Sequence, residues 1–136
     1  MKYSLFAFLI CLLFFSCKKN STQNPLIGQW VWTLEMPDNP YYFTTPQSTG
    51  VNEILTFTST GDYNIADNGT VVNFGTYKTI TAKSTAGQNV LGITYTNSRV
   101  SDSTDYYYLA NGNDSLFFVH DLIGTVGSGS RHYGRK

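Results

Sequence analysis

The sequence predicts an all-β protein, an eight-stranded antiparallel up-and-down barrel without a C-terminal helix. Apolar and polar side chains alternate in short segments separated by turn residues, and no window after residue 25 has apolar residues at helical spacing. Tyrosine, phenylalanine, threonine and valine are abundant, and they favour the pleated surface of a sheet. We expect a closed barrel rather than a sandwich, because closure removes exposed edges in a chain with few charges.

The eight predicted strands are short and follow one another along the chain. In order, they cover residues 28–36, 51–58, 62–66, 71–80, 88–96, 104–110, 115–120 and 131–136. The apolar faces of the first three carry Trp30, Trp32, Leu34 and Met36, then Leu55 and Phe57, then Tyr63 and Ile65. Asn68 and Gly69 both accept positive φ, which predicts a tight hairpin between the third and the fourth strand. Gly75 inside the fourth strand indicates a bulge or a bend.

The last four strands complete the predicted barrel. Leu91, Ile93 and Tyr95 alternate in the fifth strand, and Asn111 with Gly112 forms the turn between the sixth and the seventh. We expect the eighth strand to pair with the first, so that the sheet returns to its own beginning. A closed barrel needs no partner strand, and we therefore expect a monomer.

The N-terminal segment has the three-part layout of a secretory signal. Lys2 supplies a positive charge, residues 5–15 are almost wholly apolar, and Ser16 is a small residue directly before Cys17. The apolar run is shorter than the roughly 20 residues that a membrane-spanning helix requires. We expect residues 1–16 to be a signal peptide, 17–25 to be a polar tether, and 26–136 to form one domain.

A signal followed at once by a cysteine resembles the lipobox of bacterial lipoproteins. In that family the thiol receives a diacylglyceryl group, and the signal is removed before the cysteine. The resemblance implies lipidation of Cys17 and a place in the cell envelope, at the outer membrane. The family prefers leucine at the position that Phe14 holds here. The alternative is an ordinary cleaved signal in which Cys17 is incidental.

Composition limits the partners of the mature chain. Cys11 lies in the signal and Cys17 is the expected acylation site, so no cysteine remains for a disulfide. Without Lys2 the chain has eight basic and nine acidic side chains, a formal charge of −1. A nearly neutral domain offers no electrostatic footprint for nucleic acid. The expected partners are therefore the membrane, through the lipid, and a small molecule.

Short motifs in residues 26–136 resemble, in their shared order, the small lipocalin-like domains of bacterial lipoproteins. They are Gly28-Gln29-Trp30, Leu55-Thr56-Phe57, Gly61-Asp62-Tyr63, Gly75-Thr76-Tyr77, Asp114-Ser115-Leu116 and Tyr133-Gly134-Arg135-Lys136. The resemblance implies that Gly28 lets the chain turn into the barrel and that Trp30 plugs its closed end. It also implies that Arg135 or Arg131 lies across the Trp30 ring. Full lipocalins carry a C-terminal helix, whereas this chain ends in a predicted strand.

The interior of an eight-stranded barrel is filled by side chains or holds one small ligand. Seven aromatic side chains could project inward and contact such a ligand: Trp32, Tyr63, Tyr77, Tyr95, Tyr106, Tyr108 and Phe118. The long connection 37–50 adds Tyr42 and Phe43, and in lipocalins this loop lies over the open mouth. Buried tyrosine hydroxyls need partners, which a ligand could supply. The alternative is that these rings simply fill the core.

We expect a non-enzymatic protein without a cofactor that binds a small, partly hydrophobic ligand. His120 and His132 are the only histidines, and no cysteine or clustered carboxylates complete a metal site. Ser115 follows a turn and lacks the strand-to-helix elbow of a hydrolase. The alternative function is an interaction module with a filled barrel, which docks an envelope protein through the 37–50 loop.

Overall fold

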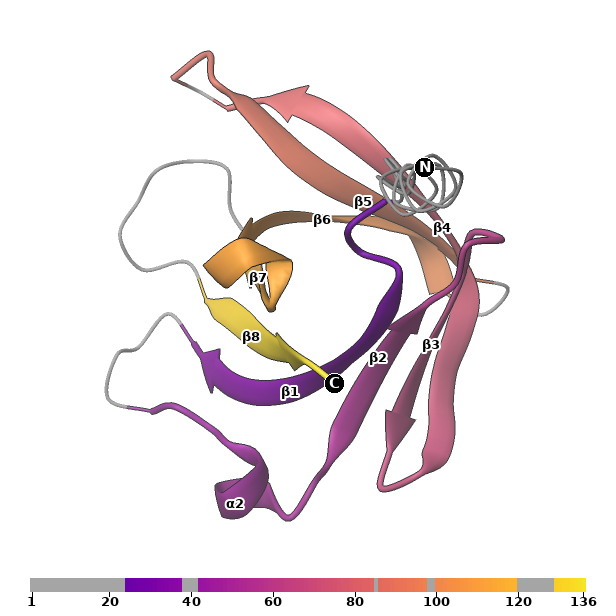
Figure 1. Cartoon of the computed structure of the whole chain (residues 1–136), viewed down its shortest axis with the longest axis vertical. Helices are drawn as coiled ribbons and strands as arrows, with labels where there is room; N and C mark the ends of the chain where they lie inside the picture. Colours follow the sequence, from indigo (N-terminus) through magenta and orange to yellow (C-terminus); the bar gives the residue numbers. More distant parts are fainter. Residues whose placement is uncertain (1–23, 38–41, 85, 98–99, 120–128) are drawn as a thin grey trace, which may run out of the picture.

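The computed structural model describes residues 24–37, 42–84, 86–97, 100–119 and 129–136. In these residues, eight antiparallel strands form a closed barrel in which each strand pairs with the next and the last pairs with the first (Figure 1). The strands are β1 (Gly28–Met36), β2 (Glu53–Phe57), β3 (Asp62–Asp67), β4 (Thr70–Lys83), β5 (Asn89–Asn97), β6 (Val100–Ala110), β7 (Ser115–Val119) and β8 (Ser130–Arg135). The predicted up-and-down barrel is confirmed, and no helix follows β8 in the described residues.

Closure joins the two strands that we expected to meet. Trp30 of β1 lies opposite Arg135 of β8, and Met36 lies opposite Ser130, with a register shift between Trp32 and Leu34. The shift is a local irregularity that changes which later residues of β1 face the interior. As a result, Glu35 rather than Leu34 lies opposite Arg131 of β8, whose side chain faces the interior.

The two predicted hairpin turns are present with the backbone that their residues favour. Asn68 and Gly69 have φ values of 49° and 85°, and they connect β3 to β4. Asn111 and Gly112 have φ values of 53° and 69° and belong to the short 3-10 segment η2 (Asn111–Asn113) between β6 and β7. Left-handed φ values at consecutive positions match the right-handed twist of the strands that such turns join.

One short helix, α2 (Pro46–Thr49), lies in the connection between β1 and β2. Thr45 caps its first turn, since its hydroxyl accepts a hydrogen bond from the Ser48 amide at 3.2 Å while the Ser48 hydroxyl accepts one from the Thr45 amide at 2.9 Å. Gly50 ends the helix in the left-handed conformation with φ 71°. A helix of four residues is too short to give a helical pattern of apolar residues, and the sequence therefore did not predict it.

Gly75 of β4 lies where the barrel wall leaves no room for a side chain. A Cβ atom at this position would lie 2.3 Å from the carbonyl oxygen of Thr96 and 3.0 Å from the ring of Tyr63. The register shift in the β3–β4 pair lies nearby, between Ile65 and Ala66. The sequence predicted a bulge or a bend at Gly75. In the structure, the backbone of β5 comes close to Gly75, and the register shift lies a few residues away.

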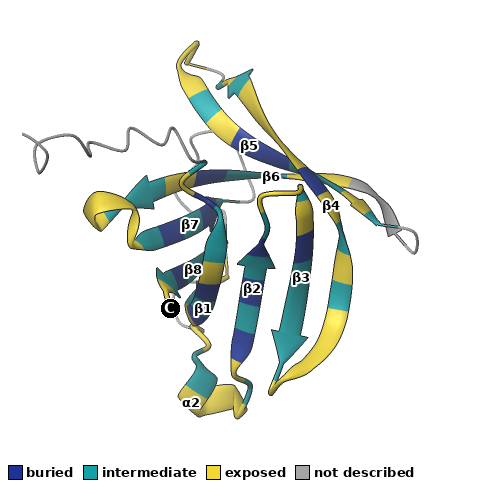
Figure 2. Cartoon of the chain, turned by 45° about the vertical axis from the view of Figure 1, so that its right-hand side comes forward, coloured by how far each residue is buried: buried dark blue, intermediate teal, exposed yellow. Residues whose placement is uncertain are grey.

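The hydrophobic core fills one end of the barrel. Its fully buried members are Leu26, Trp30, Leu55, Phe57, Ile93 and Leu116. Buried positions alternate with more exposed ones along β2 and β7, and the far ends of β4 and β5 form an exposed hairpin that extends beyond the barrel wall (Figure 2). Among the described residues, no helix is long and apolar enough to cross a membrane.

Candidate functional site

The closed end of the barrel is a packed assembly around Trp30. The Trp30 indole is fully buried, and its Nε1 donates a hydrogen bond of 2.7 Å to the carbonyl of Leu26. The Arg135 guanidinium carbon lies 4.2 Å from the centre of the Trp30 ring system, and Arg135 also donates to the carbonyl oxygens of Pro25 and Asn113 at 2.6 and 2.9 Å. These bonds fix a charged side chain over an aromatic face.

Gly28 allows Arg135 to take this position. Its φ is 134°, and a Cβ atom there would lie 3.1 Å from Nη1 of Arg135. The structure therefore brings Gly28, Trp30 and Arg135 together, in the arrangement that the resemblance implies. This end of the molecule is closed by structural contacts.

The other half of the barrel encloses a cavity of about 270 Å³. Each strand contributes to its wall, which is lined by Glu35, Leu55, Tyr63, Ile65, Asn73, Tyr95, Ser103, Asp105, Phe118, Arg131 and Tyr133. Small-molecule sites typically begin at about 300 Å³, so this volume suits a compact ligand. The barrel interior is thus filled at one end and hollow at the other.

Three of the nine predicted ligand-contacting residues line this cavity, namely Tyr63, Tyr95 and Phe118. Tyr63 and Tyr95 pack edge to face with their ring centres 4.9 Å apart. Two further predicted residues are buried without lining it. The Trp32 ring lies under the Arg131 guanidinium at 5.3 Å, and Tyr77 packs against Phe57 while its hydroxyl donates to the Thr58 carbonyl at 2.9 Å.

Tyr106 and Tyr108 do not project inward, and this expectation was wrong. The inward residue of this run is Tyr107, which is buried and lies opposite Phe118. Tyr108 is 50% exposed and stacks on Phe117 on the outer face, with ring centres 4.6 Å apart and planes within 4°. Tyr106 shares that outer face, because successive side chains of a strand alternate. Three consecutive tyrosines give no apolar alternation from which the register could be read.

Tyr42 and Phe43 are exposed and do not line the cavity, with 70% and 63% of their surface open to solvent. They lie close to its mouth, because the next residue, Thr44, forms two backbone hydrogen bonds of 2.9 Å with Glu35 at the end of β1. Tyr41, the other aromatic residue of this loop, lies outside the described residues.

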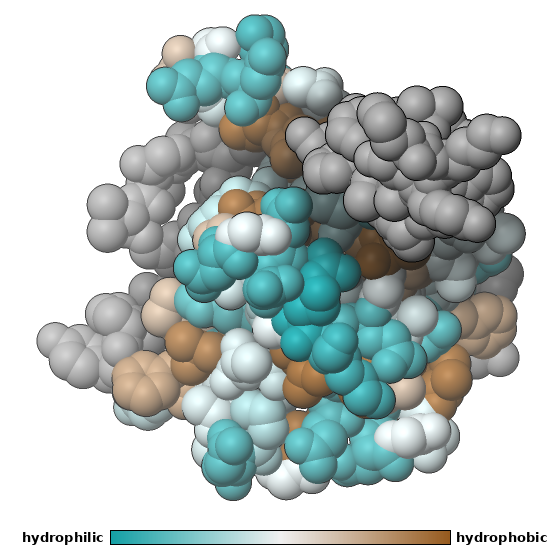
Figure 3. All heavy atoms as spheres, viewed as in Figure 1, coloured by the Kyte–Doolittle hydropathy of each residue, from teal (hydrophilic) through white to brown (hydrophobic). Residues whose placement is uncertain are grey.

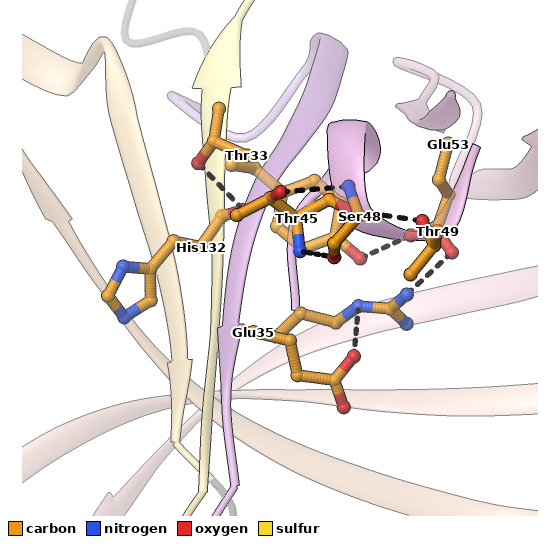
Figure 4. A network of polar contacts seen from close by, with 9 residues as sticks. Thr33, Glu35, Thr45, Ser48, Thr49, Glu53 and His132 are labelled. Carbon is orange, nitrogen blue, oxygen red and sulfur yellow. Dashed lines mark hydrogen bonds and ion pairs between the residues drawn. The ribbon is translucent and has the colours of Figure 1, made fainter. Parts of the chain in front are cut away.

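Sequence reasoning missed an ion network at the open end. Glu53 is 5% exposed, and its two carboxylate oxygens accept hydrogen bonds from the Tyr133 hydroxyl at 2.5 Å and from Nη2 of Arg131 at 2.8 Å. Nε of Arg131 lies 3.7 Å from a carboxylate oxygen of Glu35 (Figure 4). The signal was present in the sequence, since Glu53 occupies the inward-facing position two residues before Leu55 and four before Phe57.

Burial gives the tyrosines of this region raised pKa values. The pKa of Tyr133 is raised well above its usual value, mainly because burial disfavours the charged form, and the bond to Glu53 adds to this while Arg131 opposes it. Burial also raises the pKa of Tyr95 well above its usual value, and the negative charge of Asp105 raises it further. Both hydroxyls therefore stay protonated at neutral pH and remain hydrogen-bond donors.

Several polar groups of the wall are arranged around Asn73. The Tyr63 hydroxyl donates to Oδ1 of Asn73 at 3.4 Å, and the Asn97 amide donates to the same oxygen. Outside the cavity lining, the buried Nε1 of Trp32 has no hydrogen-bond partner among the described residues. A buried donor without a partner is a destabilising feature that a water molecule or a ligand can relieve.

The described residues contain no group of three or more metal-binding side chains. His132 packs against Phe117 with ring centres 4.6 Å apart, its Nε2 lies 2.9 Å from the Ser130 hydroxyl, and burial lowers its pKa. His120 lies outside the described residues. The hollow end of the barrel is therefore the candidate functional site.

No known protein family, curated protein or solved structure matches this chain.

Proposed function

We propose that this protein is a lipoprotein of the outer membrane whose lipocalin-like barrel binds a small, partly hydrophobic molecule. The observation that carries the proposal is the cavity of about 270 Å³, to which every strand of the closed barrel contributes a lining residue. A cavity that opens at one end of a rigid sheet is preformed, so binding does not require ordering the site.

The chemistry of the wall supports a ligand with both apolar and polar parts. Leu55, Ile65 and Phe118 offer apolar surface, and Tyr95 and Tyr133 line the same cavity. Apolar walls supply most of the binding free energy in such sites, while a few fixed polar groups determine which ligand fits. The raised pKa values keep both hydroxyls neutral. The Tyr133 hydroxyl donates its hydrogen to Glu53, so it can only accept a hydrogen bond from a ligand, whereas Tyr95 can donate one.

Native mass spectrometry of the full chain, purified from its native membrane in mild detergent, tests ligand binding. We expect a single added mass in stoichiometric amount. Replacing Ile65, which lines the cavity, with phenylalanine should remove this mass, because the larger ring occupies the cavity. Ile54 is the matched control, since it alternates with the inward Leu55, and Ile54→Phe should retain the ligand.

Two results would contradict the binding proposal. One is the absence of any added mass from protein that melts cooperatively. The other is an added mass that both variants retain equally, which would place the molecule outside the barrel. Thermal unfolding of each variant checks that Ile65→Phe still folds.

The membrane anchor is proposed from the sequence of residues 1–17, which lie outside the described residues. Two or more acyl chains anchor a protein stably, whereas one chain holds it only marginally. We expect Cys17→Ala to shift the protein from the membrane fraction to the soluble periplasmic fraction, measured by fractionation and immunoblotting. Continued membrane attachment of this variant would refute lipidation at Cys17.

A second candidate function is docking of an envelope protein through the 37–50 loop. The observation that favours it is the exposure of two neighbouring aromatic rings, Tyr42 and Phe43, beside the mouth. The face shown in Figure 3 has hydrophobic side chains in separate patches between hydrophilic ones. Cross-linking in whole cells distinguishes the two functions: a partner that is lost in Tyr42→Ser/Phe43→Ser while the cavity ligand is retained would favour docking.

A further inference from the structure

We propose that the ligand of this barrel is an organic cation, a compact molecule in which an ammonium group is attached to an apolar or aromatic body. The inference rests on the proposed function, namely that the cavity binds a small molecule. It adds the charge of that molecule, which follows from the ionisable groups and the rings of the cavity wall.

Negative groups outnumber positive ones at the cavity. Among the described residues, the carboxylates of Glu35 and Glu53 stand against one guanidinium, that of Arg131: Glu35 and Arg131 line the cavity, and Glu53 contacts Arg131. Much of the surrounding wall is apolar or aromatic, so charges inside the cavity are screened less than charges on an open surface. An entering cation meets a favourable potential, whereas an entering anion meets an unfavourable one.

The charge of Arg131 is already paired with a carboxylate of the protein. Its Nη2 is bonded to the buried Glu53 at 2.8 Å, and its guanidinium carbon lies 5.3 Å from the Trp32 ring and 5.9 Å from the Tyr133 ring. An anion that displaced Glu53 from Arg131 would leave the Glu53 carboxylate buried without its cation, and an anion at the other guanidinium nitrogens would lie close to the carboxylates of Glu35 and Glu53. Separating a buried pair in this way is strongly unfavourable.

Glu35 is the group that we assign to the ammonium. Its side chain is 42% exposed at the mouth, and its ion pair with Nε of Arg131 is long, at 3.7 Å. The residue is held in place by the backbone pairing of β1 with Thr44. A carboxylate that lines the cavity and is also open to solvent can accept a charged hydrogen bond without first losing a strong partner.

The aromatic rings of the wall add a second attraction for a cation. Four aromatic side chains line the cavity, namely Tyr63, Tyr95, Tyr133 and Phe118. The faces of aromatic rings attract ammonium groups, and the attraction is stronger where water is excluded. The Tyr133 ring already lies near one cation of the protein, that of Arg131. Carboxylates and aromatic faces together distinguish this wall from a purely apolar one.

Three probes of nearly the same shape test the inference: 2-phenylethylamine, 2-phenylethanol and phenylacetate. They are titrated calorimetrically into the full chain in nonionic detergent, with a titration into detergent alone as the blank. We expect the amine to bind at least about tenfold more tightly than the alcohol, a difference of about 1.4 kcal/mol. We expect phenylacetate to bind most weakly.

A pair of isosteric variants tests the assigned residue. Glu35→Gln should lower the affinity for the amine severalfold while leaving the affinity for the alcohol unchanged. Asp62→Asn removes the same charge at the exposed first residue of β3, at the end of the barrel opposite the mouth, and should change neither affinity. If the amine preference is the same in both variants, the assignment of Glu35 is overturned.

The probes also separate this inference from the function on which it rests. Binding of the alcohol or the acid as tightly as the amine would overturn the cation inference and leave ligand binding intact. Failure of all three probes to bind at millimolar concentration would overturn both.

Discussion

Glu53 and Arg131 form an ion pair at the open end of the barrel. The Glu53 side chain is nearly buried, the Arg131 side chain is 30% exposed, and their charged atoms are 2.8 Å apart. Each oxygen of Glu53 has one donor, from Arg131 and from Tyr133. A buried carboxylate with both oxygens bonded avoids most of the penalty of burial, and it fixes the position of Arg131 at the mouth.

A double-mutant cycle measures the Glu53–Arg131 pair. Glu53→Gln keeps an acceptor for Tyr133 but removes the charge, and we expect it to lower the free energy of unfolding by about 2 kcal/mol. Arg131→Met should cost a similar amount. The double variant should lose about 1–2 kcal/mol less stability than the sum of the losses in the two single variants, because neither charge is then left without its partner. Urea denaturation provides the values, and a coupling energy within about 0.3 kcal/mol of zero would contradict the pairing.

The buried tyrosines predict a loss of stability in alkaline solution. Burial raises the pKa values of Tyr133 and Tyr95 in the folded protein above the value near 10 of the unfolded chain. Above about pH 10 the unfolded state therefore binds fewer protons than the folded state, and the free energy of unfolding falls as the pH rises. Urea denaturation between pH 8 and pH 11 measures this slope.

Tyr95→Phe should have a shallower alkaline slope, because it removes one of the groups whose pKa is raised. Tyr42 is the control, since it is exposed and Tyr42→Phe should leave the slope unchanged. Equal slopes for the two variants and the unmodified protein would show that Tyr95 does not contribute.

Among the elements, β4 shows most clearly how one residue permits a strand to close the barrel. Gly75 lies where a Cβ atom would overlap the Thr96 carbonyl oxygen of β5, and that oxygen belongs to the backbone. A flexible side chain could move away, whereas this oxygen is held by the pairing of β4 with β5. The strand can be continuous over 14 residues because glycine stands at this point.

Gly75→Ala should therefore destabilise the barrel by about 1–3 kcal/mol, since the strand pair must shift to relieve the overlap. Gly134 of β8 is the matched control, because the nearest atom to a Cβ there lies 3.8 Å away. We expect Gly134→Ala to change the melting temperature little. A similar melting temperature for both variants would show that the approach at Gly75 relaxes without cost.

The element scale also shows what the sequence can and cannot predict. In β2, the spacing of Leu55 and Phe57 defined the inward face, and the structure confirms it. The same spacing puts Glu53 on the inward face. A pattern of apolar residues alone does not predict a buried carboxylate at this position. In β6, three consecutive tyrosines show no alternation of apolar and polar residues, so the sequence does not indicate which of them face inward. The prediction chose Tyr106 and Tyr108, whereas the pairing of Tyr107 with Phe118 puts Tyr107 inside.

At the scale of the whole molecule, the barrel has two different ends. Trp30 and Arg135 close one end with a ring, a guanidinium and several hydrogen bonds to backbone carbonyls. The other end encloses the cavity, with Glu35 at its mouth. Closure of the barrel could be predicted from the spacing of the turns and from the small number of charged residues. The cavity could not be predicted, because an eight-stranded barrel can be filled or hollow depending on how large side chains such as Tyr77 and Tyr95 pack inside it.

The central claim is that the hollow end of the barrel holds a small molecule. The most direct measurement is a crystal structure of the full chain isolated from its native membrane, with electron density examined between Glu35, Tyr95 and Phe118. We expect density for a compact molecule in contact with these side chains. A barrel interior occupied by the protein's own side chains, with no space between Tyr63 and Arg131, would contradict the account.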